Sequence, residues 1–327
     1  MSRSARAVAH SNIALAKYWG KADVERNLPA VPSLSLTLDA LSTTTSVELD
    51  AALESDEAQL DDHAVAGRPL ARIIQLLDRV RARAGLETRA RVVSHNDFPT
   101  AAGLASSASG FAALALAATR AAGLETAPEE VSALARASSA SAARSVYGGF
   151  ASLGAGAEAA ERVASPDHFP LAMLVAVTAT GPKAVGSTDG MQHTAGTSPY
   201  YAAWVEHAPQ LYDEVRRAVL ARDLEALGAA AEQSALMMHA CMLAARPAVV
   251  YFSPVTLSVM ERVRALRQSG TPAFYTMDAG PHVKVLTAPG AATSVAAALF
   301  DVPGVGRVIR CAPGPDAHLV DVEGAAP

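Results

Sequence analysis

Cysteine is almost missing from this chain of 327 residues, which contains only Cys241 and Cys311. Two cysteines in different contexts argue against a disulfide framework and against a cysteine-based metal site, and they fit a reducing, cytoplasmic environment. The nine histidines show no metal-ligand spacing. His239 lies within the apolar stretch ALMMHACML and is expected to be a core histidine.

Long apolar runs and blocks of one charge are missing as well. The most apolar stretch, LAMLVAVTA at 171–179, is too short to span a bilayer. No apolar run follows the opening MSRSARAVAHSN, so no signal peptide is expected. The net charge is −5, from 27 basic and 32 acidic residues, and there is no basic tail. These features argue against nucleic acid or a membrane surface as partners.

Lysine is scarce, because only four of the 27 basic residues are lysines. They are Lys17, Lys21, Lys183 and Lys284. The lysine ammonium is a compact, strongly hydrated charge, whereas arginine carries a planar fork of donors. In a chain so biased to arginine, each position that keeps lysine is a candidate for a specific role.

Strand patterns and helix patterns alternate along both halves of the chain. Strands are expected at 5–10, 34–39, 43–49, 89–95 and 171–179, as a pair at 272–277 and 282–286, and as two short strands near the end. Helices are expected at 69–85, 105–122, 128–137, 198–221, 223–245, 255–269 and 290–301. Boundary signals at 148–160 and 165–170 divide the chain into domains 1–168 and 169–327. The fold class predicted is α/β or α+β with two joined domains.

The stretch PTAAGLASSASGFAAL at 99–114 begins as a loop and ends as an apolar helix. A helix N-terminus presents unpaired N–H groups and a positive dipole end, and both favour an anion. Gly103 permits close approach of the backbone, and Ser106 and Ser107 supply hydroxyl donors or a magnesium ligand. The segment is therefore a candidate phosphate cradle; the alternative is a serine cap on a core helix.

Three further stretches combine charge with small or aromatic residues. In SNIALAKYWGK (11–21), Lys21 and Tyr18 are candidate donors to an anion, Gly20 permits close approach and Trp19 excludes water. In SSASAARSVYGGF (138–150), Arg144 is a candidate bidentate phosphate ligand. In PKAVGSTDGMQHT (182–194), Ser187 and Thr188 could add donors to what otherwise resembles an ordinary polar loop. Solvated lysines and a small-residue packing seam remain the structural alternatives.

Asp278 in FYTMDAGPHVK (274–284) follows a strand and precedes Gly-Pro, so a tight turn is expected to present it. A carboxylate in that position, with a lysine nearby, suits general-base catalysis on a substrate hydroxyl. A plain turn aspartate is the alternative.

These motifs together resemble a known family. PTAAGLASS is similar to the P-x-x-x-G-L-x-S-S phosphate loop of the GHMP kinase superfamily. NIALAKYWGK, NDFPTAAGLASSASGFAAL, ARSVYGGF, GMQHTAGTSPYYAAW and TMDAGPHVKVL follow the order of the diphosphomevalonate decarboxylase family. The resemblance implies a ribosomal-protein-S5-like N-terminal domain, a ferredoxin-like C-terminal domain and a site in the cleft between them.

Carried over residue by residue, the resemblance makes Asp278 the catalytic base and Lys17 the lysine beside it. The positions matching the family's substrate site are Tyr18, Trp19, Gly20, Lys21, Arg72, Ser139, Ala140, Ser141, Ala142, Ala143, Arg144, Ser187 and Thr188. Those matching its ATP site are Asn12, Ser94, Asn96, Ala101, Ala102, Gly103, Leu104, Ala105, Ser106 and Ser107, with Ser107 also as a magnesium ligand. Lys17 would either keep Asp278 ionised or meet the substrate carboxylate.

The chain departs from the family pattern at a few positions. The family commonly reads G-S-G-S-A-C-R-S where this chain has SSASAARS at 138–145. Ser138 and Ala140 replace two glycines, and a Cβ there would hold backbone away from a phosphate or demand φ values that glycine alone adopts cheaply. His10 and His282 stand where proline and asparagine are usual.

The activity implied is ATP-dependent decarboxylation of mevalonate 5-diphosphate to isopentenyl diphosphate, ADP, phosphate and CO2, with Mg2+ as cofactor and a homodimer as the family-level expectation. The altered stretch keeps a decarboxylase of mevalonate 5-monophosphate open. A mevalonate 3-kinase is a second alternative, which the pair of Asp278 and Lys17 opposes. A nucleotide-binding sensor without catalysis is a third, opposed by the intact Lys17, Ser107, Arg144 and Asp278.

Overall fold

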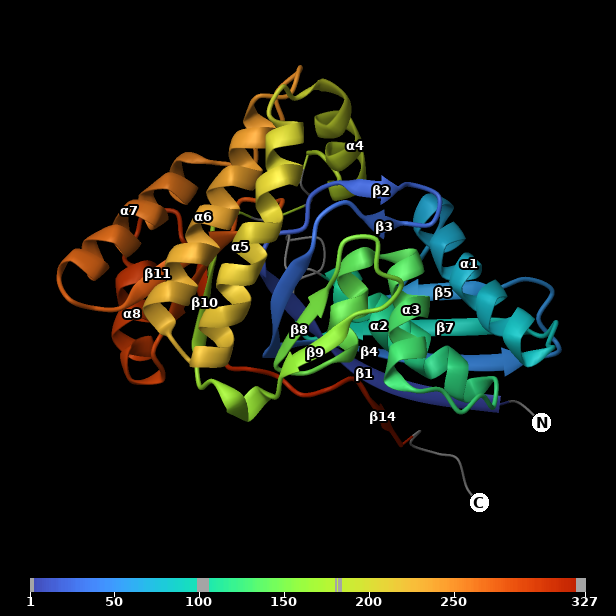
Figure 1. The fold of residues 1–327 in the computed structure, drawn as a ribbon. Helices are drawn as coiled ribbons and strands as arrows, with labels where there is room; N and C mark the ends of the chain where they lie inside the picture. The colour runs from blue at the N-terminus through green and yellow to red at the C-terminus, as the bar shows by residue number, and fades with distance from the viewer. Residues whose placement is uncertain (1–2, 99–105, 180, 182–183, 322–327) are drawn as a thin grey trace.

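The structure is a computed structural model that describes residues 3–98, 106–179, 181 and 184–321. Two lobes lie side by side, each built on its own β-sheet with helices packed against it (Figure 1). This two-domain, mixed α/β architecture confirms the predicted fold class. Within the described ranges, no helix is long and apolar enough to cross a membrane.

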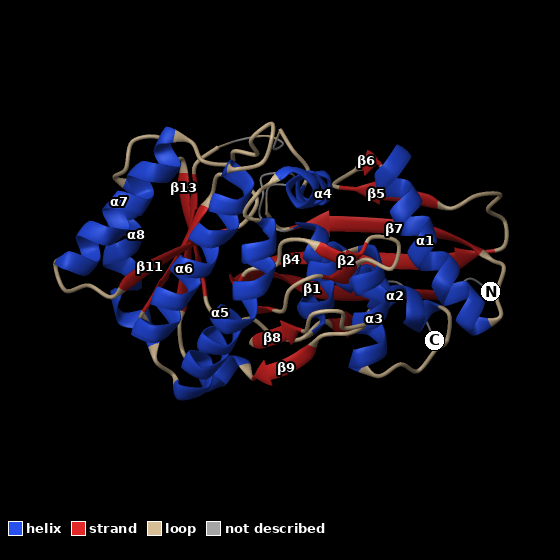
Figure 2. Ribbon diagram, turned by 45° about the horizontal axis from the view of Figure 1, so that its top comes forward, coloured by secondary structure: helices blue, strands red, loops and turns tan. Residues whose placement is uncertain are grey.

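The first lobe holds a sheet in the order β14-β1-β4-β7-β5-β6, with β8 paired to β4 and β9 to β8. The long strands run side by side across this lobe (Figure 2). The strands are β1 (Arg3–Ala16), β4 (Ser33–Asp50), β5 (Glu57–Leu60), β6 (His63–Ala64), β7 (Arg89–Asn96), β8 (Phe150–Leu153), β9 (Glu161–Ala164) and β14 (His318–Val320). A ribbon of β2 (Lys21–Asp23) and β3 (Leu28–Pro29) lies beside α4 (Figure 1).

The helices of the first lobe are α1 (Gly67–Ala84), α2 (Ser106–Ala121) and α3 (Pro128–Ser138), followed by the 3-10 helix η1 (Ala140–Val146). α2 is rich in buried alanines, and such small side chains let it lie close to β1 and β4. α1 ends at Gly85, whose φ of 64° closes the helix with a hydrogen bond to the carbonyl of Arg81. Arg81 also anchors α1, since its guanidinium donates to both oxygens of buried Asp56 at 2.8 Å.

The second lobe has a four-stranded antiparallel sheet in the order β11-β12-β10-β13. Its elements are β10 (Ala172–Val177), α4 (Ser187–Thr197), α5 (Tyr201–Ala221), α6 (Leu224–Leu243), α7 (Pro254–Gln268), β11 (Ala273–Met277), β12 (Val283–Thr287), α8 (Ala292–Phe300) and β13 (Arg307–Cys311), with 3-10 turns η2 (Pro166–His168) and η3 (Pro289–Ala291). The strand order and the helical crossovers are those of a ferredoxin-like domain, as expected.

Several sequence-based boundaries were wrong. The strands expected at 34–39 and 43–49 are one continuous strand, β4. The Gly/Ala-rich stretch 148–160 contains strand β8, and the polar loop expected at 182–194 contains most of helix α4. β14 leaves the second lobe and pairs with β1 of the first. The division of the chain at residue 168 stays a prediction.

Candidate functional site

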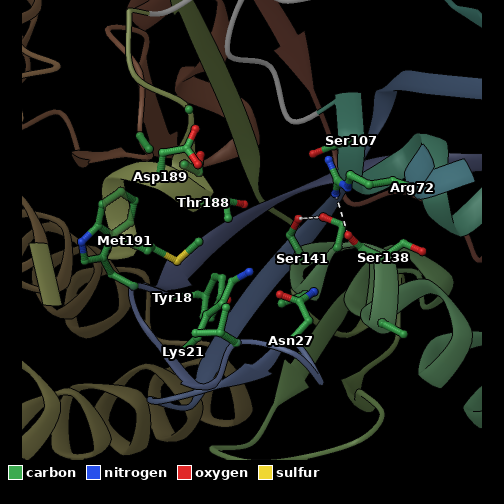
Figure 3. Close-up of a pocket in the computed structure, with 18 of the residues that line it drawn as sticks. Tyr18, Lys21, Asn27, Arg72, Ser107, Ser138, Ser141, Thr188, Asp189 and Met191 are labelled. Atoms are coloured by element: carbon green, nitrogen blue, oxygen red, sulfur yellow. Dashed lines mark hydrogen bonds between the residues drawn. The ribbon is translucent and has the colours of Figure 1, made fainter. Parts of the chain in front are cut away.

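A cavity of about 660 Å³ lies between the two lobes. Its wall combines the end of β1, the β2–β3 ribbon, the first turns of α1, α2 and α4, η1, and the turn after β11 (Figure 3). The motifs at 11–21, 138–150, 182–194 and 274–284, with Ser107 from 99–114, therefore meet around one space. Segments far apart in the sequence thus build a single candidate site.

Asp278 lies in the turn after β11, between two lysines. Lys17 donates from Nζ to Asp278 Oδ1 at 2.8 Å, and Lys284 Nζ lies 3.2 Å from Oδ2. The Asp278 side chain is 29% exposed, whereas those of Lys17 and Lys284 are 1% and 0% exposed. Of the two lysines, only Lys17 lines the cavity. The carboxylate is therefore presented to the cavity with both oxygens ion-paired.

The ionisation of this group follows from burial and charge together. Burial alone would raise the pKa of Asp278, but Lys17 and Lys284 outweigh burial and hold that pKa well below its usual range. Burial lowers the pKa of Lys17 to about 8, although Asp278 acts in the opposite direction. At neutral pH the site therefore contains a carboxylate, not a carboxylic acid.

Arg144 is a buried cation held by neutral groups. Its guanidinium donates to the hydroxyls of Ser35 and Ser33 at 3.0 and 2.6 Å and to the amide oxygen of Asn12 at 3.3 Å. Among the described residues, no carboxylate oxygen lies within 4.0 Å of the Arg144 guanidinium nitrogens. Burial lowers the pKa of Arg144 to about 10. A buried cation with neutral partners at a cavity wall is available to an anionic ligand.

Asn12, expected at the ATP site, contacts both Arg144 and η1. Its amide nitrogen donates to the carbonyl of Ser141 at 2.9 Å and to the hydroxyl of Ser145 at 2.8 Å. Asn12 lines the cavity, but these contacts use both ends of its amide to position neighbouring groups. Its assignment to ATP stays a prediction.

A group of basic side chains lines the cavity at α1 and β2. Arg72 on α1 donates to the Ser138 carbonyl at 2.6 Å (Figure 3). Its guanidinium also lies over the Phe111 ring, 4.6 Å from the ring centroid. Burial lowers the pKa of Lys21, and the nearby Arg72 and Arg68 lower it further. Arg68 pairs with Asp189 of α4 at 3.1 Å. This end of the cavity therefore carries excess positive charge.

The altered stretch 138–141 is unstrained. The described non-glycine residues with positive φ are Asn27, Asp61, Asp62 and Arg222, so Ser138 and Ala140 do not adopt the conformation that glycine favours. Ser139 and Ser141 have their hydroxyls 3.2 Å apart. Ala140, Ala142 and Ala143 are buried in η1, and of the three Ala140 also lines the cavity. The backbone conformation of this stretch therefore does not require glycine.

Gly20 approaches protein, not an open anion site. Its φ is +110°, and a Cβ there would collide with the hydroxyl of Tyr201. The space that the missing Cβ leaves is filled by Tyr201 of α5, and the assignment of Gly20 to the substrate site stays a prediction. Trp19 is 1% exposed and its carbonyl accepts from Trp204 at 2.8 Å. Tyr18 and Lys21 line the cavity on either side of this buried segment.

The serine loop is described only from Ser106 onward, where α2 begins. Ser107 is exposed and lines the cavity, facing the Arg72 side chain (Figure 3). Ala101, Ala102, Gly103, Leu104 and Ala105 lie outside the described residues. Ser94 and Asn96 lie on β7, where they bond to Thr45 at 2.9 Å and Thr43 at 2.6 Å. Those two residues are not part of the cavity wall.

Ser187 and Thr188 form the first turn of α4 and line the cavity. Sequence reasoning missed the helix because its composition is polar. The helix is explained by packing, because Gly190 lies against Trp19 and Tyr251. A Cβ added at Gly190 would lie 3.1 Å from the Trp19 ring and 3.2 Å from the Tyr251 hydroxyl. Helix stability commonly comes from such tertiary contacts.

Sequence reasoning also missed several residues of the site. Arg68 precedes Arg72 by one helical turn, a spacing that places both on one face of α1. Asp189 directly follows the expected Thr188, and both line the cavity (Figure 3). His239 is buried as expected, stacking on Phe252 at 4.6 Å. Among the residues the structure describes, no group of three or more His, Cys, Asp or Glu could hold a metal ion.

Comparisons with known proteins match both lobes. The family model for the diphosphomevalonate decarboxylase-like N-terminal domain matches residues 9–165, and that for the mevalonate 5-diphosphate decarboxylase C-terminal domain matches 173–305. The chain is 33% identical over 302 residues to the diphosphomevalonate decarboxylase of Candida albicans, covering 86% of this chain and 83% of that one. It is 34% identical over 284 residues to the phosphomevalonate decarboxylase of Haloferax volcanii, covering 86% and 88%.

A solved structure described as MDDEF in complex with MVAPP, AMPPCP and magnesium has a TM-score of 0.91 and 39% identity, and the match covers 98% of this chain and all of the other. The sequence and fold comparisons extend over most of the chain. On this evidence the chain belongs to the diphosphomevalonate decarboxylase family.

Proposed function

We propose that this protein catalyses the ATP-dependent decarboxylation of mevalonate 5-diphosphate to isopentenyl diphosphate, ADP, phosphate and CO2. The observation that carries the proposal is Asp278, a carboxylate that is ion-paired at both oxygens and presented to a cavity that basic side chains also line. Support comes from the solved relative described with MVAPP and with AMPPCP, an ATP analogue.

Asp278 acts on the tertiary 3-hydroxyl of the substrate. The carboxylate accepts the hydroxyl proton as the oxygen attacks the γ-phosphorus of ATP, and the bond from that phosphorus to the bridging oxygen breaks to release ADP. The 3-phosphate then leaves C3 with its bonding electrons. The C1–C2 bond breaks, its electrons form the C2–C3 double bond, and CO2 departs. The protein contributes chiefly positioning and charge stabilisation.

The nucleotide phosphates are placed at the first turn of α2, where Ser107 faces the cavity. Magnesium fits these residues as an ion carried by phosphate, because Mg2+ commonly keeps waters and binds few protein ligands. Ser107 Oγ would supply the protein ligand, since both oxygens of Asp278 are paired with lysines. When bound, the ion neutralises charge on the phosphates.

The substrate diphosphate is placed against Lys21, Arg72 and Arg144. Each close cation stabilises an anion by up to a few kcal/mol at an effective dielectric of about 20, before desolvation costs. A structural observation that favours a 5-monophosphate substrate is Asp189, whose carboxylate pairs with Arg68 and partly neutralises the positive charge there. The match to a phosphomevalonate decarboxylase gives that candidate further support.

An assay of ADP and CO2 release from mevalonate, its 5-phosphate and its 5-diphosphate tests the proposal. Equal release of ADP and CO2 with the 5-diphosphate as preferred substrate supports it. ADP without CO2 indicates a 3-kinase, and preference for the 5-phosphate indicates the alternative decarboxylase. The homodimeric state and the cytoplasmic location remain predictions, and light scattering of the purified protein tests the first.

A further inference from the structure

Lys284 is the ion-pair partner of Asp278 that does not line the cavity. It lies on β12, opposite Thr276 of β11, and its side chain is 0% exposed. The cavity wall includes Lys17 and Asp278 but not Lys284. Lys284 therefore contacts Asp278 from within the sheet and does not touch a ligand in the cavity.

Burying an ammonium is unfavourable unless an acid compensates it. In the described chain, Asp278 is the one acidic residue that forms an ion pair with Lys284. The neighbouring polar groups on this side of the sheet, Thr276 and His239 of α6, carry no negative charge, and burial lowers the pKa of His239 to about 3. Lys284 is thus committed to the Asp278 carboxylate.

The charged groups acting on Asp278 come from every element packed around it. Lys17 after β1 and Lys284 of β12 contact it directly. Arg144 of η1 interacts with it at longer range, and the neutral His239 interacts with its main chain. If Lys17 turns toward a substrate carboxylate, Lys284 is the remaining direct partner of the Asp278 carboxylate.

We infer that Lys284 is a positioning residue for the decarboxylation: it holds Asp278 Oδ2 from behind the cavity and keeps the carboxylate ionised when Lys17 moves to the substrate. This inference rests on the proposed function. It assigns different tasks to two lysines that contact the same carboxylate. Lys17 contacts the ligand side, and Lys284 maintains charge and orientation from the protein side.

The test removes the two lysines separately and together. Asp side chains are labelled with 13C at the carboxyl carbon, and the Asp278 signal is identified by its loss in Asp278→Asn. In Lys17→Met, Lys284 alone should keep Asp278 ionised at pH 7. In Lys17→Met/Lys284→Met, burial prevails, so the Asp278 titration should move upward by at least one pH unit, a tenfold change in the protonation equilibrium. The same midpoint of the Asp278 titration in the single and the double variant would overturn the inference.

Activity gives the second readout. Lys284→Met should lower kcat at least tenfold while KM for ATP stays within twofold, and its acid limb of kcat should move to higher pH. Thr276→Val, which removes a buried neutral hydroxyl opposite Lys284, is the matched control and should leave kcat and the acid limb unchanged. A kcat loss with an unmoved acid limb means that Lys284 is merely structural, which contradicts the inference.

The two failures are distinguishable. If the wild-type protein releases no CO2 from mevalonate 5-diphosphate, the proposed function fails and the kinetic inference with it, whereas the NMR titration reports only on the ion pairs. Lys284→Gln replaces Lys284→Met if the latter does not fold. Should neither fold, the 15Nζ signal of Lys284, easily assigned among four lysines, is compared between wild type and Asp278→Asn. A changed signal supports the pairing, and an unchanged one overturns it.

Discussion

Asp278 combines two properties that seldom occur together, partial exposure to a cavity and ion pairs at both oxygens. A carboxylate so stabilised is a weak base in isolation, and it acts through its position next to a hydroxyl whose proton becomes acidic as the phosphoryl transfer proceeds. Its role at the residue scale is therefore orientation and charge together.

We expect Asp278→Asn to lower kcat by roughly three orders of magnitude, with KM for ATP little changed, because base and charge effects act in the transition state. Steady-state kinetics measures both. The variant also leaves Lys17 and Lys284 without their acid, so its melting temperature should fall, and assays belong well below the new midpoint. Near-normal turnover would sink the assignment of Asp278.

The lowered pKa of Lys17 predicts how activity depends on pH. With a pKa of about 8, its ammonium loses its proton in mildly alkaline solution, so kcat/KM should decline above about pH 8. The folded protein binds fewer protons than the unfolded chain between about 8 and the ordinary value of 10.5, so this group's contribution to stability rises with pH there. Activity should therefore fall without unfolding, as circular dichroism can show. In Lys17→Arg that alkaline limb should disappear; its persistence contradicts the assignment.

The motifs and the family resemblance predicted one contact between charged residues of the site, but not the others. Asp278 and Lys17 were expected as neighbours, and the structure shows their contact. The role of Lys284 depends on the register of β12 against β11, which places its side chain inward. Likewise, the neighbour of Gly20 is Tyr201, a residue about 180 positions away, and no local pattern reveals such a contact.

At the scale of elements, α2 presents its N-terminus to the cavity. Ser107→Ala removes an exposed hydroxyl in the first turn, so kcat should fall and KM for ATP should rise. The free energy of unfolding should fall by less than about 1 kcal/mol, which is the loss typical of removing a helix-capping hydroxyl. Kinetics and thermal melting on the same sample separate the two roles. Ordinary kinetics with lost stability would show that Ser107 serves the helix alone.

α1 carries Arg68 and Arg72, and its place depends on the buried ion pair behind it. Asp56 accepts two bonds from Arg81 and one from the backbone N–H of Ala90 at 2.8 Å. Asp56→Ala should lower the free energy of unfolding by about 3 kcal/mol, since it leaves a buried guanidinium short of its acid. Asp78→Ala removes the exposed partner of Arg81 and should cost less than about 1 kcal/mol. Urea unfolding measures both, and equal losses would contradict this account.

Elements with strong hydrophobic periodicity were predictable. α1 ends at Gly85 as expected, and the antiparallel pair β11 and β12 flanks Asp278 as expected. α4 was missed because its helical state depends on packing against Trp19 rather than on composition. No loop forms at the break expected near residue 40, because β4 continues through it, but the pairing of β4 with β1 is irregular there, between Thr37 and Ser42.

At the scale of the molecule, substrate choice depends on charges contributed by both lobes. We predict that kcat/KM for the 5-diphosphate exceeds that for the 5-monophosphate at least tenfold, about 1.4 kcal/mol, because a smaller anion leaves cations unpaired. Lys21→Met should reduce the preference. Asp189→Asn removes the acid paired with Arg68 and should increase it. Competition assays with both substrates measure this ratio of kcat/KM values. A wild-type preference for the monophosphate would reverse the substrate assignment.

The two-domain organisation followed from the order of motifs in the sequence, but the path of the last strand did not. Three residues at 318–320 carry too little pattern to show which sheet they join, and their partner β1 lies at the other end of the chain. Topology of this kind is decided by which sheet edge remains open after the rest has folded.

That last strand gives the molecule a mechanical property. The chain passes between the lobes twice, at 165–171 before β10 and again at 312–317 between β13 and β14. Both passages lie along the bottom of the molecule in Figure 1, whereas α4 and the β2–β3 ribbon lie along the top. Because both connecting segments lie on one side, the lobes could rotate relative to each other about the line that joins these segments without stretching either of them. A hydrophobic core shared by the two lobes, which includes Leu36, Phe150, Met173 and Phe274, opposes that rotation and so holds the two walls of the cavity together.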